Sequence, residues 1–211
     1  MKKLLIFVLI ALTALSVFGC GNTEEPVETK EKTPPPETQQ TFDVSGKEII
    51  NVRITLEDGR IMEAELYPQI APITVQNFVD LCTSGFYDGI TFHRVVAGFV
   101  IQAGDPTATG TGGSEKKIKG EFNENGFKNE LSHTKGVLSM ARVSSDMNSA
   151  SSQFFIVVSN DKKDSLDGKY AAFGKLTSGY NVLAEIAKVE TDANGKPLED
   201  VIINNIRVIG E

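Results

Sequence analysis

The sequence contains no tryptophan, and only two cysteines and two histidines among its 211 residues. Two cysteines allow at most one internal disulfide bond, so a disulfide-rich scaffold is excluded. The histidines, His93 and His133, lie far apart without ligand-spaced partners, which argues against a metal site. Basic residues are also too few for a general nucleic-acid binder, because the net charge is -7 and phosphate contacts need a basic face.

Several common catalytic motifs are absent as well. The sequence has no Gly-x-Ser-x-Gly elbow, which leaves hydrolases of that class unsupported. No Gly-Lys pair is followed by the Ser or Thr of a phosphate-binding P-loop. The glycine-rich stretch at 110–113 lacks the Gly-x-Gly-x-x-Gly spacing of dinucleotide-binding proteins. These absences favour a function that needs neither a phosphate-binding loop nor a serine nucleophile of that type.

One long apolar run is present, and it lies at the beginning of the chain. Residues 4–18 are almost entirely apolar and follow two lysines. A membrane-spanning helix needs about 20 apolar residues, so this run is short for a permanent anchor and typical of a signal peptide. It ends in VFGC at positions 17–20, which resembles the bacterial lipoprotein signal, in which the cysteine receives lipid.

We therefore predict a lipoprotein signal peptide over residues 1–19 and lipidation of Cys20. The alternatives are an ordinary signal peptide cleaved near Gly19 and an uncleaved helix that stays in the membrane. Residues 20–46 are rich in Pro, Glu, Thr and Gln and have little to bury, which predicts a disordered tether. The protein would then be extracytoplasmic and lipid-anchored to a bacterial membrane.

Residues 47–211 have the composition of one globular domain. Apolar and polar residues alternate from Ile50 to Leu56 and from Met62 to Leu66, which predicts two half-buried strands. Asp58-Gly59 between them is a strong hairpin-turn signal. Pro72 opens a helical pattern that ends near Gly85.

Further short apolar runs continue the strand pattern. They predict strands at 91–96, 99–103, 137–142, 153–158, 171–176 and 201–209. A second helix is expected over Tyr180–Val189. Cys82 and His93 are expected to be packing residues. Eight short strands, frequent glycine turns and two helices indicate a mainly β protein, either an antiparallel barrel or a sandwich.

Three parts of the domain carry a more specific signal when they are taken together. They are FHRVVAGFVIQAGD at 92–105, the pair LSMAR at 138–142 and SSQFFI at 151–156, and LDGKYAAFGK at 166–175. These segments resemble the signature blocks of the cyclophilin-type peptidyl-prolyl cis-trans isomerases, in the family's order and at about its spacing. Residues 109–113 match the glycine-rich loop of that family, and the resemblance spans residues 48–210.

The resemblance implies an eight-stranded antiparallel closed barrel capped by two α-helices, which agrees with the strand count. It also implies an enzyme that accelerates rotation about X-Pro bonds in exported proteins and so assists their folding. The alternative is a module that binds proline-containing peptides, or holds unfolded chains, with little turnover. We expect proline-containing polypeptides and the membrane as partners, no nucleic acid, and a monomer.

Carried over residue by residue, the resemblance also implies a site. Its catalytic positions fall on Arg94, Phe99, Gln102 and Phe155. Its substrate-binding positions fall on Val100, Gly110, Ala141, Arg142, Gln153, Leu166 and Tyr170. Ser165 stands where many members carry the tryptophan that this sequence lacks, so we hypothesise weak binding of cyclosporin.

These residue types suit the implied chemistry. Rotation about a peptide bond faces a barrier of about 18–20 kcal/mol because the nitrogen conjugates with the carbonyl, and X-Pro isomers interconvert over ~10–100 s. The reaction breaks no bond, so we expect no cofactor and no metal. Phe99, Phe155 and Leu166 would hold the proline ring. Arg94 would hydrogen-bond the carbonyl and favour a prolyl nitrogen that has lost its conjugation, with Gln102 helping to hold Arg94 or the substrate.

Overall fold

The computed structural model describes residues 42–210 of the chain. The predicted signal peptide, the predicted lipidation site Cys20 and residues 20–41 of the predicted tether lie outside this part. Within residues 42–210, no helix has the length and apolar character that crossing a membrane requires.

The first hairpin forms as its alternating side chains predict. In β1 (Ile50–Leu56) every second side chain is buried, and β2 (Ile61–Leu66) pairs with it in antiparallel register. At the turn, Gly59 has a φ of 85°, a conformation that favours glycine. The Asp58 carboxylate accepts a hydrogen bond from the backbone N–H of Arg60 at 3.0 Å and so caps the turn.

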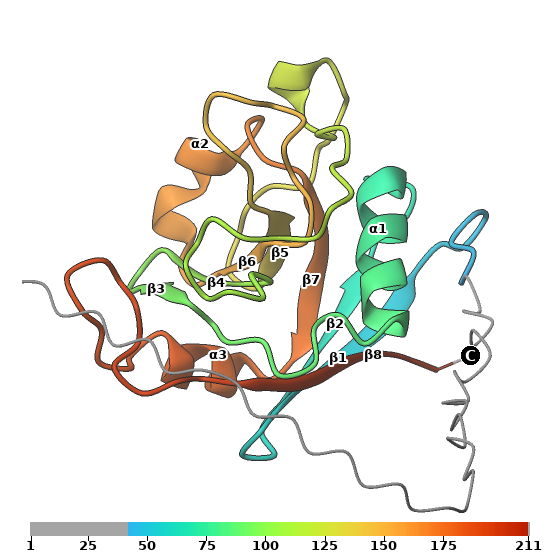
Figure 1. The fold of residues 1–211 in the computed structure, drawn as a ribbon. Helices are drawn as coiled ribbons and strands as arrows, with labels where there is room; N and C mark the ends of the chain where they lie inside the picture. The colour runs from blue at the N-terminus through green and yellow to red at the C-terminus, as the bar shows by residue number, and fades with distance from the viewer. Residues whose placement is uncertain (1–41, 211) are drawn as a thin grey trace, which may run out of the picture. The chain divides into compact units, whose positions relative to one another are not determined.

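Six more strands extend this hairpin into one strongly curled antiparallel sheet (Figure 1). They are β3 (Arg94–Val96), β4 (Val100–Ala103), β5 (Val137–Met140), β6 (Phe154–Val157), β7 (Ala172–Ser178) and β8 (Ile203–Ile209). The order across the sheet is β3-β4-β6-β5-β7-β2-β1-β8. The predicted eight antiparallel strands are therefore confirmed.

The closure of the barrel differs from the expectation. Strands β3 and β8 are the two ends of the sheet, and no ladder joins them in the part of the chain that the structure describes. The segment before β3 approaches the beginning of β8, through a single bridge between Thr91 and Ile202. The Phe92 N–H donates to the Val201 carbonyl at 2.9 Å, and Ile203 exchanges hydrogen bonds of 2.8 Å with the Gly89 N–H and the Ile90 carbonyl. The structure thus shows a curled half-barrel, because β3 is only three residues long and leaves β8 without a partner strand on that side.

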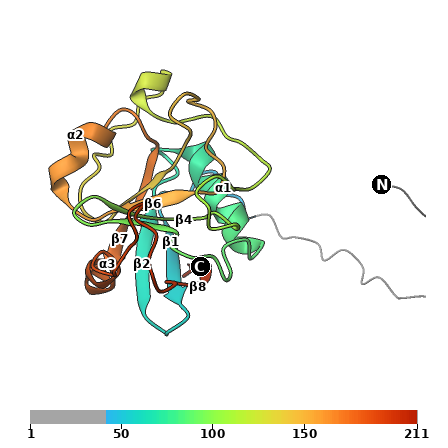
Figure 2. The same cartoon turned by 60° about the vertical axis from the view of Figure 1, so that its left-hand side comes forward.

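Both predicted helices are present. The described residues also contain three shorter helical segments. The predicted pair is α1 (Pro72–Thr83) and α3 (Tyr180–Ile186). The others are α2 (Lys163–Leu166) and the 3-10 turns Asn123–Asn125 and Asn160–Lys162. Helix α1 contacts β8 and α3 contacts β2. Figures 1 and 2 show these two helices on different sides of the curled sheet.

The N-terminus of α1 is capped from a distant part of the sequence. Pro72 occupies the first turn, where its missing N–H leaves no unsatisfied donor. The N–H groups of Ile73 and Thr74 donate to the Glu121 carboxylate at 3.1 and 2.8 Å. Glu121 is fully buried, so its carboxylate fastens the helix to the loop between β4 and β5.

Strands β4, β5 and β6 bury side chains on both faces of the sheet. On one face, Ile101 and Phe154 enter the main core, where Phe154 meets Phe78 edge-on with ring centroids 5.3 Å apart. On the other face, Val100 and Phe155 belong to a second, smaller apolar cluster. Because side chains alternate along a strand, each strand here supplies one residue to the core for every residue it supplies to the opposite face.

The described part of the domain begins before the predicted boundary at Lys47. The side-chain amide of Gln76 in α1 donates to the Phe42 carbonyl at 2.7 Å, and its oxygen accepts from the Val44 N–H at 3.1 Å. Val44 is buried in the main core. Residues 42–46, assigned to the tether by composition, thus pack against the domain because two of them are apolar.

Candidate active site

Strand register brings residues of separate sequence blocks side by side on the face opposite the main core. Arg94 in β3 lies opposite Gln102 in β4, and Gln102 lies opposite Phe155 in β6. Phe155 in turn lies opposite Ser139 in β5. Directly opposed residues of antiparallel strands point to the same face. Four strands therefore present one continuous line of side chains.

Six of the predicted site residues share a single apolar cluster on this face. They are the buried Val100, Phe155 and Leu166 and the half-buried Phe99, Ala141 and Tyr170. The Tyr170 ring meets the Phe155 ring edge-on, with centroids 5.7 Å apart. We call these six residues the apolar cup.

Three polar predicted residues form a hydrogen-bonded line beside the cup. Nη1 of Arg94 lies 3.4 Å from Oε1 of Gln102, and Nε2 of Gln102 donates to Oε1 of Gln153 at 2.8 Å. All three side chains are half-buried. We call Arg94, Gln102 and Gln153 the polar row.

The polar row continues into the loop after β4, which spans residues 105–113 and is called the glycine loop below. Nε2 of Gln153 donates to the carbonyls of Gly112 and Gly110 at 2.7 and 3.1 Å. A hollow of about 410 Å³ lies here and is lined by Gln102, Gln153, the glycine loop and Ala141. The structure therefore places Gly110 beside Gln153, at the edge of this hollow.

The side chain of Arg142 has partners within the protein. Its Nε donates to the Lys169 carbonyl at 3.0 Å, and its Nη1 donates to the Val143 carbonyl at 3.1 Å. The guanidinium also lies over the Tyr170 ring, 5.0 Å from the ring centroid. Arg142 thus fixes the loop after β5 and one wall of the cup, a structural role that the sequence analysis did not assign to its side chain.

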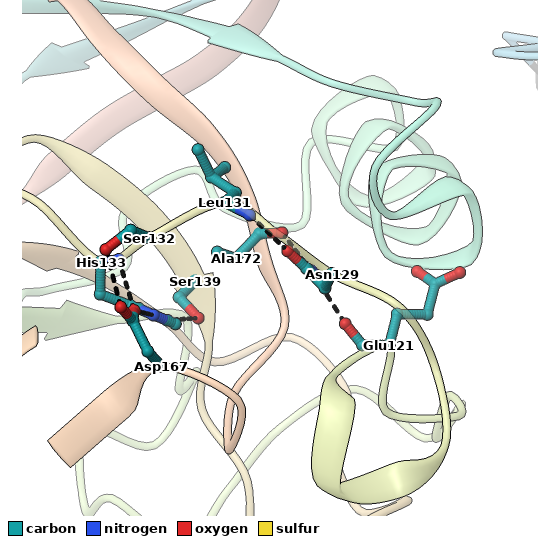
Figure 3. Close-up of polar contacts among 8 residues, drawn as sticks. All are labelled: Glu121, Asn129, Leu131, Ser132, His133, Ser139, Asp167 and Ala172. Atoms are coloured by element: carbon teal, nitrogen blue, oxygen red, sulfur yellow. Dashed lines mark hydrogen bonds and ion pairs between the residues drawn. The ribbon is translucent and has the colours of Figure 1, made fainter. Parts of the chain in front are cut away.

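A buried polar group behind the cup was missed by the sequence analysis (Figure 3). The His133 side chain is 1% exposed, with Nδ1 2.8 Å from Oδ1 of Asp167 and Nε2 2.9 Å from Oγ of Ser139. Burial lowers the pKa of His133 more than the Asp167 carboxylate raises it. The ring is therefore neutral at pH 7, with the proton on Nδ1, because a carboxylate can only accept a hydrogen bond.

This polar group supports two walls of the cup. The His133 ring stacks on Phe155, with centroids 6.0 Å apart and planes inclined by 21°. Asp167 directly follows Leu166, and its carboxylate also accepts from the His133 N–H and from the Ser132 hydroxyl, both at 2.7 Å. The position of Asp167 beside Leu166 in the third block was the available signal, but its partners are distant in the sequence and follow no periodicity.

The order Ser139, His133, Asp167 has the connectivity of a serine hydrolase triad. In such a triad the hydroxyl must reach a substrate carbonyl. Ser139 is fully buried and His133 almost so, so no substrate reaches this hydroxyl in the structure. The three residues act here as a support for the cup.

His93 packs beneath the glycine loop, as the sequence predicts. It is buried, and a side chain added at Gly110 would lie 3.9 Å from its ring. Neither ring nitrogen has a hydrogen-bond partner within residues 42–210. Burial lowers the pKa of His93, so it too is neutral at pH 7.

The arrangement can hold a small apolar ring and place a guanidinium beside a polar group attached to that ring. The cup supplies apolar walls, and Arg94 supplies the planar set of hydrogen-bond donors of a guanidinium. Within residues 42–210, no group of three or more His, Cys, Asp or Glu side chains is placed to hold a metal ion. Cys82 is buried in the main core, and burial raises the pKa of its thiol.

Comparisons with known proteins identify the family. The family model described as "Cyclophilin type peptidyl-prolyl cis-trans isomerase/CLD" matches residues 51–208. The chain is 47% identical over 146 residues to peptidyl-prolyl cis-trans isomerase B of Bacillus subtilis, which covers 69% of this chain and 92% of that protein. It is 42% identical over 154 residues to peptidyl-prolyl cis-trans isomerase ppi1 of Schizosaccharomyces pombe, which covers 72% and 95%.

A solved structure extends the agreement to the fold. The crystal structure of a Cryptosporidium parvum cyclophilin-type peptidyl-prolyl cis-trans isomerase matches with a TM-score of 0.70 at 34% identity, covering 77% of this chain and 99% of that one. The chain belongs to the cyclophilin-type peptidyl-prolyl cis-trans isomerase family. Its reaction is the cis-trans isomerisation of peptidyl-prolyl bonds, and the family binds proline-containing peptides.

Proposed function

We propose that this isomerase acts outside the cytoplasm on exported, proline-containing polypeptides, as a monomer held at a bacterial membrane by lipid on Cys20. The support is the sequence of residues 1–20, with two lysines, a short apolar run and VFGC, followed by a polar segment. A lipid anchor and a tether would keep the site near polypeptides that emerge from the membrane.

The apolar cup is proposed to bind the proline ring. The ring is uncharged and compact, and Phe99, Phe155 and Leu166 offer apolar walls of matching character. The Cryptosporidium parvum isomerase was also solved in the presence of the dipeptide Ala-Pro, which carries such a ring. Fixing the ring leaves the rest of the substrate free to turn about the X-Pro bond.

Arg94 is proposed as the residue that lowers the rotation barrier. As the bond twists, the prolyl nitrogen loses its conjugation with the carbonyl and becomes a hydrogen-bond acceptor. A guanidinium donor aimed at the twisted state stabilises it more than either planar isomer, which is the condition for faster rotation. Gln102, 3.4 Å from Arg94, would hold the guanidinium in that direction. The observation that carries this proposal is the polar row lying directly beside the cup.

The activity test uses the full chain in detergent and a prolyl peptide. We expect Arg94→Ala to lower kcat/KM about 100-fold, the usual loss when one such donor is removed, with peptide affinity changed less than threefold. Arg53→Ala is a matched control, because Arg53 also lies on a strand but pairs with Glu63 at 2.8 Å in β2. A wild-type chain that binds the peptide without turnover would support the binding or holdase alternative instead.

The anchor test is independent of activity. We expect the wild-type protein in the membrane fraction of a bacterial host and Cys20→Ala in the soluble or secreted fraction. Membrane retention of Cys20→Ala would indicate an uncleaved helix, and a soluble wild-type protein would indicate an ordinary signal peptide cleaved near Gly19.

A further inference from the structure

Asp105 is a buried carboxylate at the start of the glycine loop. It follows β4 after Gly104 and is 1% exposed. Its Oδ1 accepts from the N–H and hydroxyl of Thr107 at 2.7 and 2.8 Å. Its Oδ2 accepts from the N–H groups of Gly110 and Gly112 at 2.7 and 3.0 Å, and from the N–H of Thr109 at 3.2 Å.

These donors keep the carboxylate charged. Burial alone raises the pKa of Asp105, but the hydrogen bonds from Thr107, Gly112 and Gly110 outweigh it and lower the pKa to about 2. Hydrogen bonds to a charged acceptor are stronger than those between neutral groups. Backbone N–H groups of the loop therefore surround a carboxylate that is negatively charged at neutral pH.

The same loop residues also hold the polar row. Gly110 and Gly112 donate their N–H groups to Asp105, and their carbonyls accept from Nε2 of Gln153. Because those carbonyls can only accept, Gln153 must present its Oε1 to Gln102. Gln102 must then present its own Oε1 to Arg94, which can only donate.

Hydrogen bonds thus run from the guanidinium through the two glutamines to the carbonyls of Gly110 and Gly112, while the N–H groups of the same two glycines hold the carboxylate of Asp105. Within the polar row every link donates in the same direction, from Arg94 through Gln102 and Gln153 to the loop carbonyls. These aligned hydrogen bonds polarise one another, and a reversed amide would break two links at Gln102 and three at Gln153. The orientation of Arg94 consequently depends on where the loop carbonyls lie.

We propose that Asp105 is a positioning residue for Arg94: through the glycine loop it sets the amide orientations of Gln153 and Gln102 and so the direction of the guanidinium. It touches neither substrate nor Arg94. The proposal rests on the catalytic role proposed for Arg94 above. It predicts that loss of the carboxylate slows turnover while the cup still binds proline.

The loop offers a second way to disturb the same link. A side chain added at Gly112 would collide with the Asp105 carboxylate and with the Thr107 hydroxyl. Gly112→Ala therefore displaces the loop from Asp105 without removing the charge. Agreement between this variant and Asp105→Asn would exclude an effect of charge alone.

The structure also supplies a matched control. Glu121 is a fully buried carboxylate that, like Asp105, accepts several hydrogen bonds, from Ile73 and Thr74 of α1. Within residues 42–210, no hydrogen bond links the Glu121 carboxylate to the polar row. Glu121→Gln should therefore lower stability without changing the kcat of the folded protein.

The test compares the full-length variants Asp105→Asn, Gly112→Ala and Glu121→Gln with the wild type at 10 °C. NMR exchange measurements with a prolyl peptide give kcat and peptide affinity separately, and the side-chain amide resonances of Gln102 and Gln153 report their hydrogen bonds. For Asp105→Asn and Gly112→Ala we expect kcat about tenfold lower, affinity within twofold, and shifts of both glutamine amide resonances. If Asp105→Asn does not fold, Gly112→Ala decides the question.

Two results would overturn the proposal. One is a folded Asp105→Asn or Gly112→Ala with wild-type kcat and unshifted amide resonances. The other is an equal loss of kcat in Glu121→Gln, which would show a general effect of weakened packing. Both results differ from failure of the catalytic role proposed for Arg94, which Arg94→Ala tests. If Arg94→Ala keeps wild-type kcat, the catalytic role of Arg94 is refuted, whatever the Asp105 variants show.

Discussion

The apolar cup and the polar row lie side by side on one face of the sheet, but they are supported by different means. The buried members of the cup, such as Phe155 and Leu166, are packed like core residues and are backed by His133 and Asp167. The polar row is half-buried, and its order comes from hydrogen bonds that end at the glycine loop.

Because the cup and the polar row are supported differently, peptide affinity and turnover rate should respond to different substitutions. Removing a cup residue takes away packing as well as a substrate contact, so stability and affinity should fall together. Removing a member of the polar row leaves groups that water can reach, so stability should change little while the direction of Arg94 is lost. The predictions below test this separation, beginning with the largest expected effect.

Phe155→Ala should cause the largest loss. The ring is buried and contacts both His133 and Tyr170. Its removal should lower the free energy of unfolding by about 3–5 kcal/mol, the usual cost of a buried Phe→Ala change. Peptide affinity should fall at least tenfold. Urea unfolding and NMR titration with a prolyl peptide measure the two effects.

Phe155→Leu is the control for that change, because it keeps much of the apolar volume and should retain most of the stability. If Phe155→Ala lost affinity with no loss of stability, the cup would be a surface feature rather than part of the packed structure.

Gln102→Ala should affect rate far more than stability. It removes the link between Arg94 and Gln153, so kcat should fall about tenfold, which corresponds to about 1.4 kcal/mol of barrier. The free energy of unfolding should change by less than about 1 kcal/mol, because the side chain is half-buried. Gln76→Ala is a matched control, since Gln76 is also half-buried and hydrogen-bonded but holds Phe42 and Val44. A rate loss in both variants would contradict the separation.

Stability should fall as the pH is lowered from 7 to 5. Burial lowers the pKa of both His133 and His93 below their ordinary 6.5, so in this range the unfolded chain binds more protons than the folded one. The free energy of unfolding then decreases with falling pH, by at most about 1.4 kcal/mol per pH unit for each histidine. The pKa values of Asp105 and Asp167 are lowered from 3.8, so their contributions change only below this range.

His133→Gln should reduce this pH dependence, because only His93 then titrates between pH 7 and 5. Urea unfolding at several pH values measures the slope for each protein. An unchanged slope in the variant would mean that His133 does not stay neutral behind the cup.

Much of the fold followed from local patterns. Alternation from Ile50 to Leu56 predicted β1, Asp58-Gly59 predicted its turn, and Pro72 predicted the start of α1. The closed barrel did not follow, because closure depends on how the short strand β3 meets β8, and that is a long-range property with no periodic signal.

The site shows the same limit. Arg94, Gln102 and Phe155 were predicted from their blocks, and strand register places them together. The support of His133 by Asp167 and the winding of the glycine loop around Asp105 could not be predicted, because both join single polar residues through tertiary contacts. A buried polar residue looks like a surface residue in the sequence, and only its partners distinguish the two.

Tyr170→Phe should have the smallest effect and tests where the cup ends. The ring contacts of Tyr170, edge-on to Phe155 and beneath the Arg142 guanidinium, do not involve its hydroxyl. Losing the hydroxyl should therefore change the free energy of unfolding by less than about 0.5 kcal/mol and peptide affinity by less than twofold. Urea unfolding and the peptide titration measure both. A tenfold loss of affinity would instead show that the hydroxyl binds the peptide, and Tyr170 would then function with the polar row rather than as an apolar wall.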